Sequence, residues 1–200
     1  MAEHVWGACK GPDPFIVVEL GDGIGLSVFM NGSFIKGTTD IFGEMGHTVY
    51  REDGDICKCG NRGCLETFAG RSAIINKVKE NLADNLGFFR KSFGSSFTFE
   101  DICSNAAEEN KLALLVLRDA AKAIGDTIAN VVNVLGITRV VLYGETVKAG
   151  TVLTDEIQNS IRKHCIYPLN QGSEIILSGL DVFASASGAA FFAIDKFFNT

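Results

Sequence analysis

Two neighbouring segments decide how this chain is interpreted: Gly43-Glu44-Met45-Gly46-His47 and Cys57-Lys58-Cys59-Gly60-Asn61-Arg62-Gly63-Cys64-Leu65-Glu66. Together they hold one His, three Cys and two Glu. The spacing H-x9-C-x-C-x4-C is that of a complete tetrahedral Cys₃His zinc site. The predicted metal ligands are His47, Cys57, Cys59 and Cys64. Because four protein ligands leave no open position for a substrate, we predict a structural zinc.

Two carboxylates flank these ligands. Glu44 lies three residues before His47, and Glu66 lies two residues after Cys64. We therefore expect both carboxylates beside the metal but outside its coordination sphere. Ionised carboxylates accept hydrogen bonds, and the vicinal hydroxyls of a sugar donate them. The alternative for Glu66 is that it stabilises the start of a helix by facing its dipole, and both roles are compatible.

The composition is that of a globular chain with a substantial core. It has 200 residues, of which 46% are hydrophobic and 21% charged, with a net charge of −6. This acidic balance argues against direct binding to nucleic acid. The remaining cysteines, Cys9, Cys103 and Cys165, are scattered and are expected to be small buried apolar residues. No secretory signal or membrane-length apolar run is found, which predicts a soluble, cytoplasmic protein.

The order of apolar patterns predicts an α/β layer domain. Strands are predicted at 15–20, 26–30, 33–35, 139–143 and 174–177, and helices at 66–82, 111–135, 154–164 and 184–198. Asn31-Gly32 predicts a type I′ hairpin turn. Thr98 is the predicted N-cap of a further helix, with Asp101 three residues later, and Gly136 ends the long helix. Residues 83–98 are predicted to form a loop.

The chain resembles the ROK family of sugar kinases and sugar-responsive repressors. The resemblance is carried by the two segments above together with Gly21-Asp22-Gly23-Ile24-Gly25, Val140-Val141-Leu142-Tyr143-Gly144 and Ser187-Gly188-Ala189-Ala190. It implies an actin-like, ribonuclease-H-like fold of two lobes, of which residues 1–200 resemble the C-terminal, sugar-binding lobe. The N-terminal lobe, the DNA-binding domain of the repressors and the general-base Asp of the kinases are expected upstream of Met1.

The same resemblance implies roles for particular residues. Sugar binding falls on Glu44, His47 and Glu66, with His47 also a zinc ligand. The phosphate-loop-like positions are Gly21, Asp22, Gly23 and Gly25. Asp22 stands where family kinases carry Thr, and a carboxylate repels phosphate by about 4 kcal/mol per charge pair at about 4 Å and an effective dielectric near 20. Glu145 stands where the kinases more often have Gly, so both positions disfavour ATP.

We therefore expect the effector domain of a transcriptional regulator, closer to the family's repressors than to its kinases. It would bind a monosaccharide, contact DNA only through another domain, and form a homodimer or homotetramer. The first alternative is the C-terminal lobe of an ATP-dependent hexose kinase, which would make the protein an enzyme. A further alternative is an assembly module in which the zinc loop and Phe-rich faces serve oligomerisation.

Overall fold

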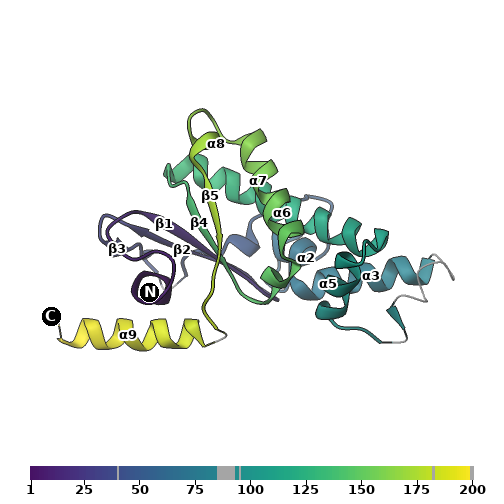
Figure 1. The fold of residues 1–200 in the computed structure, drawn as a ribbon, viewed down its shortest axis with the longest axis horizontal. Coiled ribbons are helices and arrows are strands. Elements are labelled where there is room, and N and C mark those ends of the chain that lie inside the picture. The colour runs from purple at the N-terminus through teal and green to yellow at the C-terminus, as the bar shows by residue number, and fades with distance from the viewer. Residues whose placement is uncertain (40, 85–92, 95, 182, 199–200) are drawn as a thin grey trace.

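A five-stranded sheet organises the part of the chain that the structure describes. The computed structural model describes residues 1–39, 41–84, 93–94, 96–181 and 183–198. The sheet order is β3-β2-β1-β4-β5 (Figure 1). The strands are β1 (Phe15–Leu20), β2 (Ile24–Met30), β3 (Ser33–Phe34), β4 (Arg139–Tyr143) and β5 (Glu174–Leu177). The first three form an antiparallel meander, whereas β4 and β5 run parallel to β1, as the predicted mixture of hairpins and helical crossovers requires.

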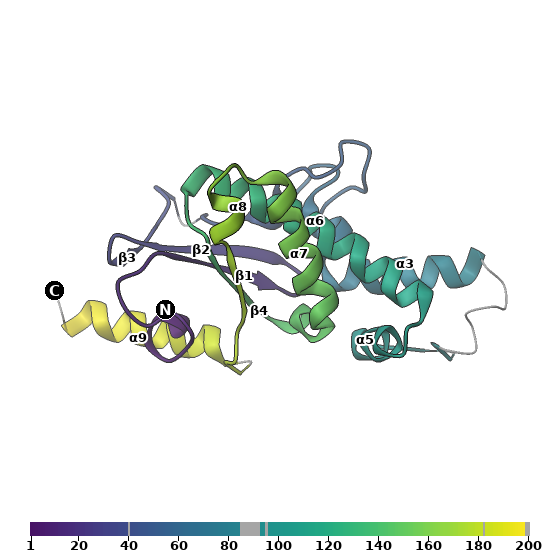
Figure 2. The same ribbon diagram turned by 45° about the horizontal axis from the view of Figure 1, so that its top comes forward.

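Helices lie on both sides of the sheet. The α-helices are α1 (Ala2–Val5), α2 (Leu65–Ala69), α3 (Arg71–Asp84), α5 (Phe99–Ala107), α6 (Lys111–Leu135), α7 (Thr151–His164), α8 (Leu169–Gly172) and α9 (Ala184–Phe198). Short 3₁₀ helices are η1 (Met45–His47) and η2 (Glu145–Ala149). In Figure 2, α6 and α7 lie over one face of the sheet, while α1 and α9 lie on the other. None of the described helices has the length and apolarity to cross a membrane.

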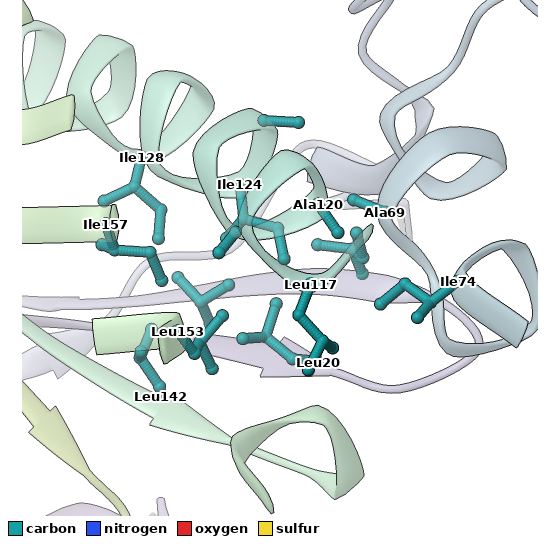
Figure 3. Packing of buried hydrophobic residues seen from close by; sticks show 14 of the residues in the cluster. Leu20, Ala69, Ile74, Leu117, Ala120, Ile124, Ile128, Leu142, Leu153 and Ile157 are labelled. Carbon is teal, nitrogen blue, oxygen red and sulfur yellow. The ribbon is translucent and has the colours of Figure 1, made fainter. Parts of the chain in front are cut away.

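The main core lies between the sheet and the α6–α7 pair. On β1, Ile16, Val18 and Leu20 belong to this cluster, whereas Phe15 belongs to a smaller one on the opposite face. This division follows from the alternation of side chains along a strand. In Figure 3, Ile124 of α6 is grouped with buried side chains from the sheet and α7. Each buried aliphatic side chain contributes roughly 1.5–3 kcal/mol, so this cluster fixes the sheet that carries the site.

Most predicted turns and caps are confirmed. Asn31 and Gly32 both have positive φ, as a type I′ turn requires. Thr98 and Asp101 form a reciprocal capping box at the start of α5. Gly136 ends α6 in the left-handed conformation. The predicted loop 83–98 falls largely on residues 85–92 and 95, which lie outside the described residues.

The prediction of one continuous helix over residues 66–82 is wrong. Residues 66–82 do not form one helix, because the chain breaks at Gly70, whose backbone is extended. A Cβ on Gly70 would lie 2.7 Å from the carbonyl oxygen of Asp22. Close approach of the β1–β2 turn therefore overrides the helical periodicity. The helix predicted at 154–164 also begins earlier, at Thr151, and the short α1, α8, η1 and η2 were not predicted.

Candidate functional site

The four predicted metal ligands come together. His47 ends η1, Cys64 immediately precedes α2, and Cys57 and Cys59 lie on the intervening loop. Their ligand atoms all lie within 4.8 Å of one another. The Sγ of Cys57 is 3.5 Å from Nδ1 of His47, and the Sγ atoms of Cys59 and Cys64 are 3.6 Å apart. Ligands at zinc bond lengths on a tetrahedron are separated by about 3.5 Å, so this donor set fits a tetrahedral metal ion.

Glycines allow the loop to close around the cluster. Gly63 has φ +73°, and a Cβ there would lie 1.4 Å from the carbonyl oxygen of Arg51. The Gly63 carbonyl accepts a hydrogen bond from the Tyr50 backbone N–H at 2.8 Å. The Leu65 N–H donates to the carbonyl of Thr48 at 2.9 Å. These contacts place the two ends of the loop, and hence His47 and Cys64, side by side.

Two of the thiols in the cluster differ in acidity. Loss of solvation raises the pKa of Cys64 to about 12, and hydrogen bonds with Cys59 and Cys57 add to the effect. A hydrogen bond from the backbone N–H of Asn61 lowers the pKa of Cys59. Because a metal binds thiolate rather than thiol, metal binding here must displace protons.

The two predicted carboxylates lie on either side of His47. Oε2 of Glu44 is 3.7 Å from Nε2 of the imidazole, and Oε1 of Glu66 is 3.9 Å from Nδ1. Nδ1 also faces the Cys57 sulfur, so this nitrogen points toward the metal cluster while Nε2 points toward Glu44. The Glu66 side chain is only 9% exposed and lies 3.3 Å from the ammonium of Lys58, whereas the Glu44 side chain is 56% exposed. Glu66 also lies in the first turn of α2, so its helix-stabilising role is compatible with a ligand role.

The glycine turn between β1 and β2 is held by an arginine that the sequence analysis did not single out. Nη2 of Arg71 donates to Asp22 at 2.6 Å, and its Nη1 is paired with Glu145. Ser72 donates two hydrogen bonds to the other carboxylate oxygen of Asp22, Oδ1, from its N–H at 3.2 Å and from its hydroxyl at 2.6 Å. The hydrogen bond from Arg71, and to a smaller extent the one from the Ser72 side chain, lowers the pKa of the Asp22 carboxyl. The two acids expected to repel phosphate therefore share one guanidinium, and no local sequence signal links these three distant positions.

A cavity of about 470 Å³ opens from Glu44 between the sheet and the α1–α9 pair. Its floor includes Glu19 of β1 and Ser27 of β2, and its far side includes Gly188 of α9. This volume is within the range of small-molecule sites. The cavity therefore gives the Glu44 carboxylate a concave space in which a small polar ligand could be held.

Comparisons with known proteins agree with the sequence resemblance. A model of the ROK family matches residues 1–196. The chain is 32% identical over 98% of its length to the DNA-binding transcriptional dual regulator NagC of Escherichia coli K12, covering 47% of that protein. It is 30% identical over 92% of its length to a glucokinase of Halalkalibacterium halodurans, covering 58% of it.

A solved ROK family transcriptional regulator, a homolog of the E. coli MLC protein, superposes with a TM-score of 0.85 at 28% identity. That match covers 94% of this chain and 48% of the regulator. The actin-like α/β fold is thus shared with ROK regulators and sugar kinases. The chain spans about half the length of the curated relatives it matches.

Proposed function

The chain belongs to the ROK family, and from that premise we propose that residues 1–200 form the sugar-sensing lobe of a transcriptional regulator. The lobe binds a monosaccharide at Glu44, His47 and Glu66, beside a structural zinc held by the Cys₃His cluster. DNA binding belongs to another part of the whole protein. The single observation that carries the proposal is the position of His47, whose two ring nitrogens face the metal cluster and Glu44 separately.

This arrangement assigns the metal a positioning role. When Nδ1 of His47 binds zinc, the imidazole is fixed in one orientation and tautomer, with Nε2 available for a hydrogen bond. Glu66 lies next to the cluster and Glu44 next to Nε2. Two carboxylates that accept hydrogen bonds and one imidazole N–H that donates one are suited to a row of sugar hydroxyls.

A regulator also requires that the ligand change a conformational equilibrium. Sugar bound at the cavity beside Glu44 would contact both lobes of the whole protein and favour the arrangement in which they are closed. The DNA-binding end then differs between the sugar-bound and sugar-free populations. The ligand acts only to the extent that it binds one conformation more tightly than the other.

The main rival is a sugar kinase, which the similarity to glucokinases favours. A kinase needs backbone N–H groups of the glycine turn free to bind nucleotide phosphates. Here Asp22 occupies the turn. Asp22, Glu145 and Glu100 carry three negative charges, whereas Arg71 and Lys148, which interact with them, carry two positive charges. The remaining negative charge disfavours ATP, which supports a sensor over an enzyme.

Isothermal titration calorimetry of the whole protein with glucose, N-acetylglucosamine and a wider set of monosaccharides tests the proposal. We expect saturable binding of at least one sugar without any requirement for ATP. Failure of every sugar to bind, with the metal site fully loaded, would refute sugar sensing. Sugar-dependent release of ADP from ATP would establish the kinase instead.

A further inference from the structure

The three cysteines of the metal cluster differ in their exposure to solvent. Cys57 and Cys64 are only 3% and 0% exposed, whereas Cys59 is exposed. The structure describes all six cysteines of the chain, and Cys59 is the only exposed one. A small oxidant in solution therefore reaches Cys59 before it reaches the other two thiols of the cluster.

A tight turn presents Cys59 at its tip. The Cys57 N–H donates to the Asn61 carbonyl at 2.7 Å, and the Gly60 N–H donates back to the Cys57 carbonyl at 2.9 Å. Gly60 has φ +94°, and a Cβ built there would meet nothing within 4 Å. The outer side of the turn is thus open, so Cys59 can rotate its side chain without disturbing the core.

Cys64 is the thiol that lies within reach of Cys59. Their Sγ atoms are 3.6 Å apart. The Sγ of Cys57 faces other groups, since it lies 3.5 Å from Nδ1 of His47 and 3.4 Å from Oε1 of Glu66. The sulfurs of a disulfide are about 2.0 Å apart. The Cys59 sulfur would therefore need to move only about 1.6 Å to bond to that of Cys64.

From this geometry we infer that Cys59 and Cys64 form a peroxide-sensitive thiol pair, whose oxidation to a disulfide releases the metal. Cys59 is the thiol that the oxidant attacks, and Cys64 is the thiol that completes the disulfide. The inference rests on the proposed structural zinc and adds a modification site to the proposed sugar-sensing lobe.

The chemistry balances with a hydroperoxide as the oxidant. Both cysteines are thiolates when they are metal ligands. The Cys59 thiolate attacks one peroxide oxygen, the O–O bond breaks, and a sulfenic acid and an alkoxide (hydroxide from hydrogen peroxide) form. The Cys64 thiolate then attacks the Cys59 sulfur, so that the S–S bond forms, the S–O bond breaks and hydroxide leaves. Two electrons pass from the thiolates to the peroxide, and the two oxyanions take two protons from water.

Loss of this pair leaves His47 and Cys57 as the remaining ligands of the cluster. A structural zinc is held by four protein ligands, so two are too few to retain it. His47 then loses the bond that fixes its orientation. Sugar affinity at the proposed site should therefore fall on oxidation and recover when a dithiol reduces the disulfide and zinc is restored.

The test treats the whole, zinc-loaded protein with hydrogen peroxide and follows zinc release, free thiols and disulfide-linked peptides. Trypsin cuts after Lys58 and Arg62, which places Cys57, Cys59 and Cys64 on three separate peptides. We expect the loss of one zinc ion and two thiols per chain, with the second and third of these peptides linked. Dithiothreitol and added zinc should restore the starting state.

Two variants sharpen the test. Cys59→His removes the thiol pair but leaves four ligands of the Cys₂His₂ type, so it should keep its zinc in peroxide. Cys103→Ser removes a partly exposed thiol outside the cluster and should release zinc as the unmodified protein does. If Cys59→His does not bind zinc, the peptide map of the unmodified protein decides alone.

The outcomes separate this inference from the proposed function. A disulfide between Cys59 and Cys64, formed together with zinc release, supports the inference. Zinc that stays bound while Cys103 is oxidised, or a disulfide that joins Cys57 to either of the other two, overturns it. Purified protein that holds no zinc overturns it together with the proposed zinc site. Peroxide-driven zinc release from a protein that binds no sugar refutes sugar sensing and leaves the thiol pair standing.

Discussion

Removal of the metal should open the loop between His47 and Cys64 while leaving the rest of the lobe folded. Among residues 48–63, all of which the structure describes, only Tyr50 packs against the main core. The loop is otherwise held by backbone hydrogen bonds, by two isolated β-bridges and by contacts near the surface, such as those of Arg51 with the Phe68 ring and of Arg62 with the Gly54 carbonyl. We therefore expect the order of the loop to depend mainly on the cross-link that the proposed zinc would provide between its ends.

The size of the effect follows from the length of the loop. A metal that joins His47 to Cys64 closes a loop of about 17 residues, and closure of such a loop is worth about 3 kcal/mol in the chain-entropy model of a covalent cross-link. Chelation should lower the free energy of unfolding by about this amount. The cost should fall on the loop first, because its ends are no longer held together.

The assay combines metal analysis, urea unfolding and hydrogen exchange before and after chelation. The amides of Tyr50 and Gly63, which donate to backbone carbonyls within the loop, should lose protection, whereas those of β1 and β4 should keep it. Cys59→Ser should reproduce the effect, because Cys59 is exposed and its substitution removes a ligand without disturbing the core. Cys103→Ser, on α5, is the control that should retain the metal.

Either of two results would refute this reasoning. Loop amides that stay equally protected after complete metal loss would mean that the loop is held by its own contacts. Simultaneous loss of protection in the loop and in the sheet would mean that the metal supports the whole fold rather than one segment.

Three further predictions concern single substitutions. Gly63→Ala should reduce metal content and lower the free energy of unfolding by at least about 1–2 kcal/mol. The reason is that the left-handed backbone disfavours a side chain and that the Cβ would overlap the carbonyl of Arg51. Normal metal content in this variant would contradict the prediction. The pairing of Asp22 with Arg71 lowers the carboxyl pKa, so its stabilisation is present above the ordinary carboxyl pKa and is lost as pH falls through the depressed value. Urea midpoints should therefore show Asp22→Asn less stable at pH 7, by about 1 kcal/mol or less, with the difference vanishing in acid; a difference independent of pH would argue against the pair. Ile124→Ala should lower the free energy of unfolding, measured with urea, by about 2–5 kcal/mol, because Ile124 is fully buried. The metal content of this variant should be unchanged.

The clustering of His47 with the three cysteines was predictable because its information is local. All four ligands lie within one short segment, so spacing and ligand chemistry were enough to bring them together. The same holds for the hairpin at Asn31-Gly32 and for the α6 terminus at Gly136, where single residues impose a backbone conformation. Glu44 and Glu66 were also placed correctly beside His47, since each is tied by a few residues to a ligand.

The features that escaped prediction depend on contacts between distant segments. Arg71 joins Asp22 to Glu145 only because the fold brings the β1–β2 turn, α3 and η2 to one place. The break at Gly70 has the same origin, since the neighbouring turn occupies the space that a continuous helix would need. The cavity beside Glu44 likewise exists only once α1 and α9 are placed against the sheet.

The central claim is that the carboxylates around His47 bind sugar, and Glu44→Gln tests it most directly. Glu44 is mostly exposed and is not a metal ligand, so the substitution should leave folding and metal content unchanged. Loss of one charged acceptor should weaken sugar binding by about 10- to 100-fold in calorimetry of the whole, metal-loaded protein. Unchanged affinity of Glu44→Gln for a sugar that the unmodified protein binds would contradict the account.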